Sequence, residues 1–156
     1  MKRVWILGTM VLLILSLFIS AMAFAAEDPK QYYAKYLSVA DVEKATGLKG
    51  ITTKHDYTLH FLNPEGKEVL QVRFEKAKGW EQQTKDKKYW TEVKGIGDQA
   101  ALFMPGMPQQ LAFTKGPHMI VVTTFQKQGV TMFVTADQLK AVCKVIEPRL
   151  PKEDYL

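Results

Sequence analysis

The sequence predicts an α+β fold, in which two to four helices pack against a single antiparallel β-sheet of about five strands. Two observations carry this prediction. Apolar residues recur every three to four positions near both ends of the chain, and every second position between them. The strand-like segments follow one another through turn residues and do not alternate with helices, which is typical of helices laid on an antiparallel sheet.

The first 25 residues predict a signal peptide. Lys2 and Arg3 precede an apolar run, and Ala23-Phe24-Ala25 has the small-x-small pattern that signal peptidase cleaves. We expect cleavage near Ala25 and a periplasmic or secreted protein. The alternative is that the apolar run stays as an uncleaved anchor, since it could just span a bilayer. That anchor would be the only membrane contact.

A short N-terminal helix is expected within residues 26–36. Asp28 and Pro29 suit an N-cap and the first helical position. Tyr32 and Tyr36 would then share one face of this helix, because they are four residues apart.

The main α+β domain is assigned to residues 37–150. Its first helix follows Ser38-x-x-Asp41, a capping-box pattern, and ends before Gly47, which suits a left-handed C-terminal position.

Five strands are expected after this helix. Their ranges are 57–62, 68–74, 99–104, 110–114 and 118–125. The first two alternate apolar and polar residues around turn residues 63–66, which predicts a β-hairpin. We expect Tyr57, Leu59 and Phe61 on its buried face and His60 on the opposite face. The other three strands form a meander.

The last helix opens with a second capping box, Thr135-x-x-Gln138. Its apolar stripe consists of Leu139, Val142, Cys143 and Ile146. Residues 151–156 are expected to be a loose polar tail.

Composition excludes several classes of protein. The chain has 21 basic residues, and removal of Lys2 and Arg3 leaves 19 against 16 acidic ones, or +3. This charge is too small to indicate a nucleic-acid partner. The single cysteine, Cys143, cannot form an internal disulfide.

The sequence offers no catalytic residue, so we expect the protein not to be an enzyme and to need no cofactor. Ser38, the only serine after the predicted signal peptide, is better explained as a helix cap, and Cys143 lies in an apolar stripe. A hydrolase with an unrecognised site remains an alternative.

Residues 95–98 contain a Gly-x-Gly followed by an acidic residue. A dinucleotide loop would need a helix after it, whereas a strand follows here, and Asp98 would repel phosphate. We expect Gly95 and Gly97 to form a backbone turn in which Asp98 binds nearby amides.

A copper site is the alternative that the methionines raise. Met104, Met107 and His118 lie within fifteen residues, and thioether and imidazole groups suit Cu(I). A metal site would use these three residues in a periplasmic copper carrier. The Pro-Gly between the methionines is also typical of a hairpin turn.

Aromatic side chains are the best candidates for partner contact. They are Tyr32, Tyr36, Trp80, Tyr89 and Trp90. The last three lie in a segment that interleaves aromatic residues with lysines and could contact anionic lipid, a glycan or a partner protein. Alternatively, one or both tryptophans anchor this segment to the core while the lysines remain solvated.

The order of segments resembles a family of small exported bacterial domains. The quoted segments are SVADVEKATGLKG, LHFLNPEGKEVLQVRF, VKGIGDQAALF, LAFTKGPHMIVVTTF and ADQLKAVCKVI. They are similar to actinobacterial lipoprotein domains of unknown function, some with a PsbP-like fold, that carry a G-[IL]-G-D-x-A step and a Lys-Gly hairpin. This chain lacks their lipid-attachment cysteine and paired cysteines. The resemblance implies no catalytic residues.

The function predicted from the sequence is that of an exported, non-enzymatic binding or accessory domain. We expect it to contact a protein partner or a small apolar ligand in the cell envelope, through a sheet face or the groove between helices and sheet.

Overall fold

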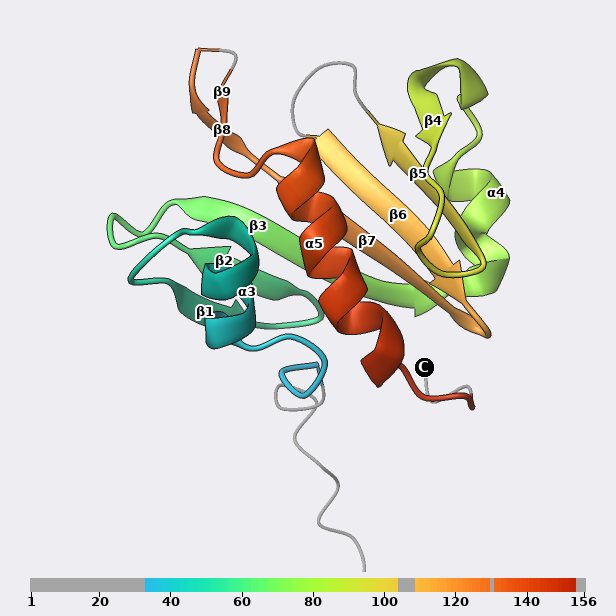
Figure 1. Ribbon diagram of the computed structural model, residues 1–156, viewed down its shortest axis with the longest axis horizontal. Coiled ribbons are helices and arrows are strands. Elements are labelled where there is room, and N and C mark those ends of the chain that lie inside the picture. The colour runs from blue at the N-terminus through green and yellow to red at the C-terminus, as the bar shows by residue number, and fades with distance from the viewer. Residues whose placement is uncertain (1–32, 104–108, 130, 154–156) are drawn as a thin grey trace, which may run out of the picture.

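The computed structural model describes residues 33–103, 109–129 and 131–153 and shows an α+β fold built on a seven-stranded antiparallel sheet (Figure 1). The strand order is β1-β2-β3-β7-β6-β5-β4. The strands are β1 Thr52–His55, β2 Leu59–Leu62, β3 Glu68–Lys76, β4 Trp90–Glu92, β5 Gln99–Phe103, β6 Gln109–Lys115 and β7 His118–Thr124. A separate hairpin pairs β8 (Gln126–Gln128) with β9 (Thr131–Met132).

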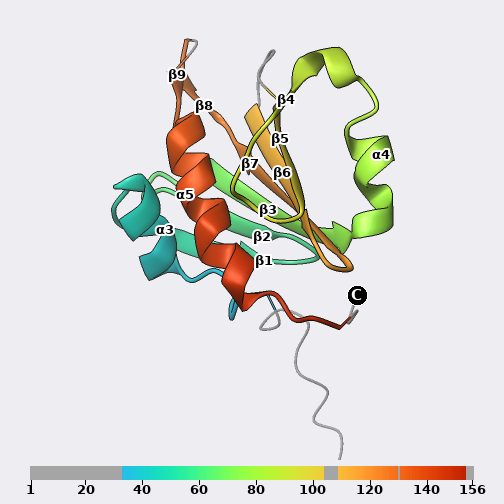
Figure 2. The same cartoon turned by 45° about the vertical axis from the view of Figure 1, so that its right-hand side comes forward.

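Three α-helices accompany the sheet in the described part of the chain. They are α3 (Val39–Thr46), α4 (Trp80–Gln83) and α5 (Ala136–Ile146). Single 3₁₀ turns lie beside them at η1 (Ala77–Gly79), η2 (Lys87–Tyr89) and η3 (Glu147–Arg149). Figure 2 shows α3 and α5 on one side of the sheet and α4 on the other. The predicted signal peptide lies outside the described residues, and residues 33–36 form a turn where the N-terminal helix was expected.

The five predicted strands are confirmed as β2, β3, β5, β6 and β7, but the main sheet is larger than predicted. Its two additional strands, β1 and β4, are its edges. Edge strands are short and can be polar, because they pair on one side only. β1 reads Thr-Thr-Lys-His and β4 has three residues, so neither carries a clear apolar alternation.

The expected position of Tyr57 on the buried face is wrong. Tyr57 is 94% exposed and lies in the turn between β1 and β2. Asp56 stabilises this turn, because its carboxylate accepts a hydrogen bond from the Thr58 amide at 2.8 Å. Leu59 and Phe61 are fully buried, as expected.

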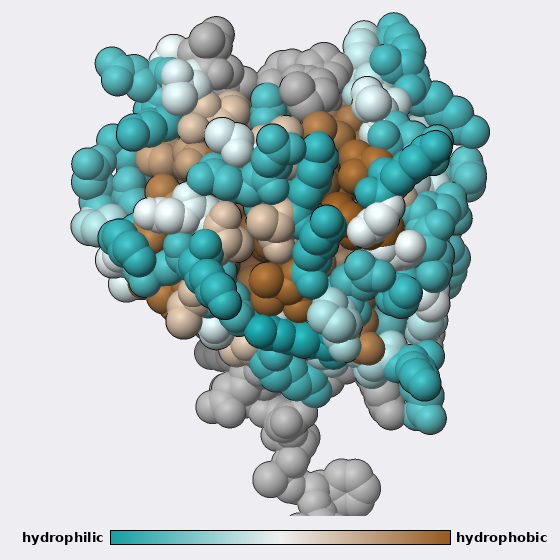
Figure 3. All heavy atoms as spheres, in the orientation of Figure 1, coloured by the Kyte–Doolittle hydropathy of each residue, from teal (hydrophilic) through white to brown (hydrophobic). Residues whose placement is uncertain are grey.

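The main core lies between the first face of the sheet and helices α3 and α5. The predicted apolar stripe of α5 is confirmed, since Leu139, Val142, Cys143 and Ile146 are all fully buried. Alternate residues of the central strands β3, β7 and β6 meet it from the sheet. From the α5 side, hydrophilic side chains cover most of the surface (Figure 3). Helices α3 and α5 therefore cover the first face of the sheet.

Both predicted capping boxes are present. The Ser38 hydroxyl accepts from the Asp41 amide and the Asp41 carboxylate accepts from the Ser38 amide, while Thr135 and Gln138 repeat this arrangement at α5. Gly47 follows α3 with φ of 74°, which confirms the left-handed C-terminal position.

Asp41 also links α3 to the 3₁₀ turn η3, which follows α5. Its carboxylate oxygens lie 2.6 and 2.9 Å from the two terminal nitrogens of Arg149, a bidentate pairing. The hydrogen bonds from Arg149 are the largest cause that holds the pKa of Asp41 well below its ordinary value of 3.8.

Replacing Asp41 with asparagine is expected to lower the free energy of unfolding by about 1 kcal/mol at neutral pH. Because the folded pKa of Asp41 lies below the unfolded one, the advantage of the native chain is complete above pH 3.8 and declines as the pH falls below it. Urea unfolding of both proteins between pH 7 and pH 2.5 measures this convergence. A difference that stays constant over the range would contradict the assignment.

Candidate functional site

Small side chains leave space on the second face of the sheet. The register places Glu92, Ala101, Ala112 and Val121 side by side across β4, β5, β6 and β7. The two alanines lie in the middle of this row. Bulky groups from outside the sheet can therefore approach its backbone there.

The connection from β3 to β4, residues 77–89, covers part of this face. Trp80 and Trp90 pack against a second, smaller core of Ala112, Met119 and Val121. This confirms that the two tryptophans anchor the segment. Both remain partly exposed, so the anchor role does not use their whole surface.

Polar bridges hold the same segment in place. The amide of Gln83 accepts from Arg73 of β3 at 3.3 Å and donates to Gln110 of β6 at 3.2 Å. The buried Thr84 hydroxyl donates to the Trp80 carbonyl at 3.0 Å. The α4 segment is thus fixed to strands on both sides of β7.

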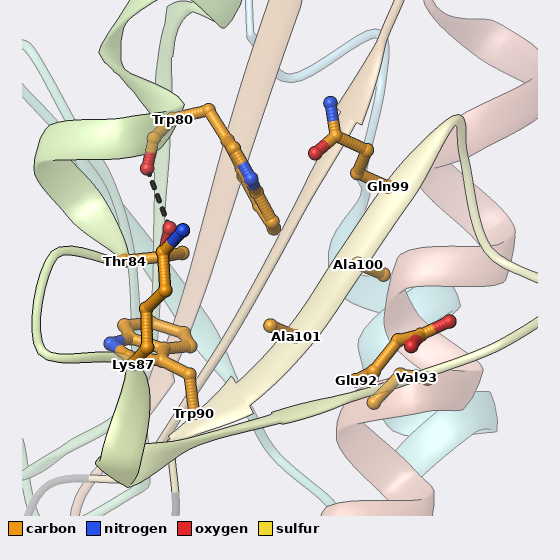
Figure 4. A pocket seen from close by; sticks show the side chains of 9 residues that line it. All are labelled: Trp80, Thr84, Lys87, Trp90, Glu92, Val93, Gln99, Ala100 and Ala101. Carbon is orange, nitrogen blue, oxygen red and sulfur yellow. Dashed lines mark hydrogen bonds between the residues drawn. The ribbon is translucent and has the colours of Figure 1, made fainter.

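A cavity of about 430 Å³ lies between the α4 segment and strands β4 and β5. Its lining residues are Trp80, Thr84, Lys87, Trp90, Glu92, Val93, Gln99, Ala100 and Ala101. Figure 4 shows Trp80 reaching from α4 toward Ala101, with Lys87 beside Trp90. Glu92 and Val93 lie on the other side of Ala101. The cavity volume falls within the range of about 300–1,000 Å³ that is usual for small-molecule sites.

Several polar groups at this cavity have no protein partner. In the described part of the chain, the side chains of Glu92 and Gln99 make no hydrogen bond or ion pair, and the two indole N–H groups make none either. Lys87 is 3.8 Å from Glu81, both being largely exposed. The site therefore combines aromatic walls and a small apolar floor with unused donors and acceptors.

The other predicted contact residues are dispersed. Tyr36 is only 4% exposed and packs on Phe74 in the main core, with ring centroids 5.5 Å apart, so it offers no contact surface. Tyr89 is 40% exposed and meets Phe103 edge-on, next to the cavity but not lining it. Tyr32 lies outside the described residues.

Of the three proposed copper ligands, His118 alone lies in the described part of the chain. Met104 and Met107 lie outside the described residues, between the end of β5 and the start of β6. His118 pairs with Lys115 at the opposite end of β6, about 20 Å along a seven-residue strand. It is 3% exposed, and its Nε2 is 3.0 Å from the Glu153 carbonyl oxygen.

His60 lies on the second face of the sheet, as expected. The carboxylate of Glu68 is hydrogen-bonded to Nδ1 of His60, and that of Asp56 lies 3.2 Å from Nε2. Both ring nitrogens are thus occupied. Within the described ranges, no group of three or more His, Cys, Asp or Glu side chains could hold a metal ion.

The Gly-x-Gly segment is the backbone turn predicted from the sequence. Gly95 and Gly97 have φ of 77° and 58°. The Asp98 amide donates to the Thr114 carbonyl at 2.8 Å, and its carboxylate accepts from the Gly116 amide at 2.7 Å. The turn fixes β5 to the β6–β7 hairpin.

The two side chains that could act as nucleophiles, Ser38 and Cys143, have structural roles instead. Ser38 caps α3, and Cys143 is fully buried, which raises the pKa of its thiol well above the ordinary value. None of the helices among residues 33–103, 109–129 and 131–153 is long and apolar enough to span a membrane.

Sequence reasoning found the two tryptophans but missed the rest of the cavity. Ala101, Gln99 and Glu92 belong to strands whose partners are set by pairing across the sheet. One feature of the sequence could have indicated the cavity: Ala100 and Ala101 are small residues in a strand where larger apolar residues are usual.

Comparison of the chain with protein-family models, with curated proteins and with solved structures found no match.

Proposed function

We propose that this protein is an exported, non-enzymatic binding domain that holds a small molecule in the cavity between Trp80, Trp90 and Ala101. The observation that carries the proposal is the cavity itself: two tryptophans, one from α4 and one from the edge strand β4, stand beside a floor of small residues, and the side chains of Glu92 and Gln99 lack partners in the described part of the chain. Aromatic walls with a few polar groups are typical of small-molecule sites.

The preference for a small molecule over a protein partner rests on shape. The aromatic residues suggested as a contact surface do not form one patch, because Tyr36 is in the core. The two tryptophans instead border a hollow of about 430 Å³. A ring-shaped ligand would fill that hollow, whereas a flat protein surface would leave it empty.

We propose a non-enzymatic function because of where the reactive side chains lie. Ser38, Cys143, His60 and His118 each have a structural role or a protein partner. Export rests on the signal-peptide pattern that ends at Ala25.

Tryptophan fluorescence offers a direct test, because Trp80 and Trp90 are the only tryptophans besides Trp5. The processed protein, or the full chain carrying Trp5→Phe, therefore reports on this cavity alone. Titration with the uncharged dye N-phenyl-1-naphthylamine is expected to quench this fluorescence with one site per chain. Ala101→Leu fills the floor and is expected to weaken dye binding at least about tenfold.

Tyr57→Leu is the matched control, since it removes an exposed aromatic ring far along the sheet from the cavity. It should leave dye binding unchanged. If Ala101→Leu folds normally and binds the dye as well as the native chain does, the proposed site is wrong.

A further inference from the structure

We infer that the ligand of this cavity is an uncharged, hydroxyl-bearing ring, that is, one or two pyranose units of a neutral saccharide. The inference rests on the proposed binding function and specifies the ligand class. It is carried by three properties of the cavity: a partly exposed aromatic face, hydrogen-bonding groups without partners in the described part of the chain, and opposite charges on its two sides.

The aromatic face comes from Trp80. In Figure 4 its indole is seen edge-on, so that one ring face borders the open space above Ala101, with Gln99 across that space. Ala101 is 7% exposed and, with Ala100, lines the cavity with small apolar side chains. A pyranose presents a face of C–H bonds, and this apolar face can stack on the large apolar surface of an indole.

The unused polar groups argue against a purely apolar ligand. The side chains of Gln99 and Glu92 and the two indole N–H groups have no partner in the described part of the chain. A hydrocarbon ligand would remove these groups from water without replacing their hydrogen bonds, which is costly. Hydroxyl groups around a ring both donate and accept, so they can satisfy a carboxylate, an amide and an indole together.

The charges argue against an ionic ligand. Lys87 stands on the Trp90 side of Ala101 and Glu92 on the other. A cation stacked on the tryptophans would be drawn to Glu92 but would face Lys87, and an anion would meet the reverse. A neutral ligand meets neither repulsion. The cavity volume, near the lower end of the usual range, suits one or two rings.

Calorimetric titration of the processed protein tests the inference with cellobiose, maltose and N,N′-diacetylchitobiose, together with tetramethylammonium as a cationic probe. We expect at least one disaccharide to bind with a Kd of about 10⁻⁵ to 10⁻³ M and to displace the dye. We expect Trp80→Leu to weaken this binding at least about tenfold.

Gln99→Leu tests the saccharide inference separately from the general binding function. This exposed residue is expected to be tolerated by the fold, and its loss should weaken disaccharide binding about two- to tenfold, because a hydrogen bond to a ring hydroxyl is removed. Dye titration of the same variant shows whether the cavity is still formed. Tyr57→Leu should change neither disaccharide binding nor dye binding. If the dye binds at the cavity but no disaccharide displaces it, the saccharide inference is overturned and the binding function stands. The same holds if tetramethylammonium binds more tightly than every disaccharide and Glu92→Gln abolishes tetramethylammonium binding. If Ala101→Leu and Trp80→Leu weaken the binding of neither the dye nor a disaccharide, the proposed binding function is wrong as well.

Discussion

Replacing Gly97 with alanine is expected to reduce the free energy of unfolding by about 3–5 kcal/mol. A Cβ at this position would lie 2.1 Å from the Thr114 carbonyl oxygen and 2.9 Å from the Phe113 ring. The first neighbour is backbone of β6 and cannot rotate away. The residue also has φ of 58°, a left-handed conformation that side chains disfavour. Urea unfolding, followed by far-UV circular dichroism, measures the loss.

Gly95→Ala is the matched control, two residues earlier in the same turn. Gly95 has φ of 77°, but a Cβ there meets nothing within 4 Å. We therefore expect it to cost about 1–2 kcal/mol, the backbone penalty alone. Equal losses in the two variants would contradict the assigned close approach of the turn to β6.

The same turn matters for the candidate site because it sets the position of β5. Asp98 is hydrogen-bonded to both Thr114 and Gly116, and β5 begins at the next residue with Gln99. A variant that displaces the turn would move Gln99 and Ala101 relative to Trp80. A loss of ligand affinity in Gly97→Ala at a temperature where it remains folded would therefore reflect the geometry of the cavity.

The sequence predicted those elements whose burial is regular. Leu59, Phe61 and the α5 stripe alternate or recur at a fixed period because one face meets the core, and both capping boxes rely on residues three positions apart. These signals are local. The edge strands β1 and β4 lack them, since one side of each strand has no neighbour and little apolar surface to bury.

The candidate site was less predictable, because its parts come together only through pairing across the sheet. Trp90 and Glu92 reach β5 through the β4–β5 register, and Trp80 reaches the same space from a helix on the second face. Tyr36 has the same chemical character as the tryptophans in the sequence, yet it packs in the main core. Aromatic composition alone cannot separate a contact residue from a core residue when both faces of the sheet are covered.

A buried hydroxyl in β7 leads to the second large prediction. Thr124 is fully buried, donates to the Val69 carbonyl at 3.1 Å and accepts from the Val134 amide at 3.1 Å. Val69 is the bulged residue of β3, since Leu70 pairs with Phe61 and Glu68 with Leu62. Thr124 therefore joins a bulge in the sheet to the chain that leads into α5.

Replacing Thr124 with valine keeps the shape but removes both hydrogen bonds, which leaves a carbonyl and an amide unpaired in the core. We expect this to lower the free energy of unfolding by about 2–4 kcal/mol. Thr124→Ser keeps the hydroxyl and loses only a methyl group, so it should cost about 1 kcal/mol. Urea unfolding of the three proteins measures both values, and amide hydrogen exchange at Val134 should accelerate in the valine variant only. If serine proves as damaging as valine, the side chain of Thr124 stabilises the core by packing, and the hydrogen bonds to Val69 and Val134 contribute little.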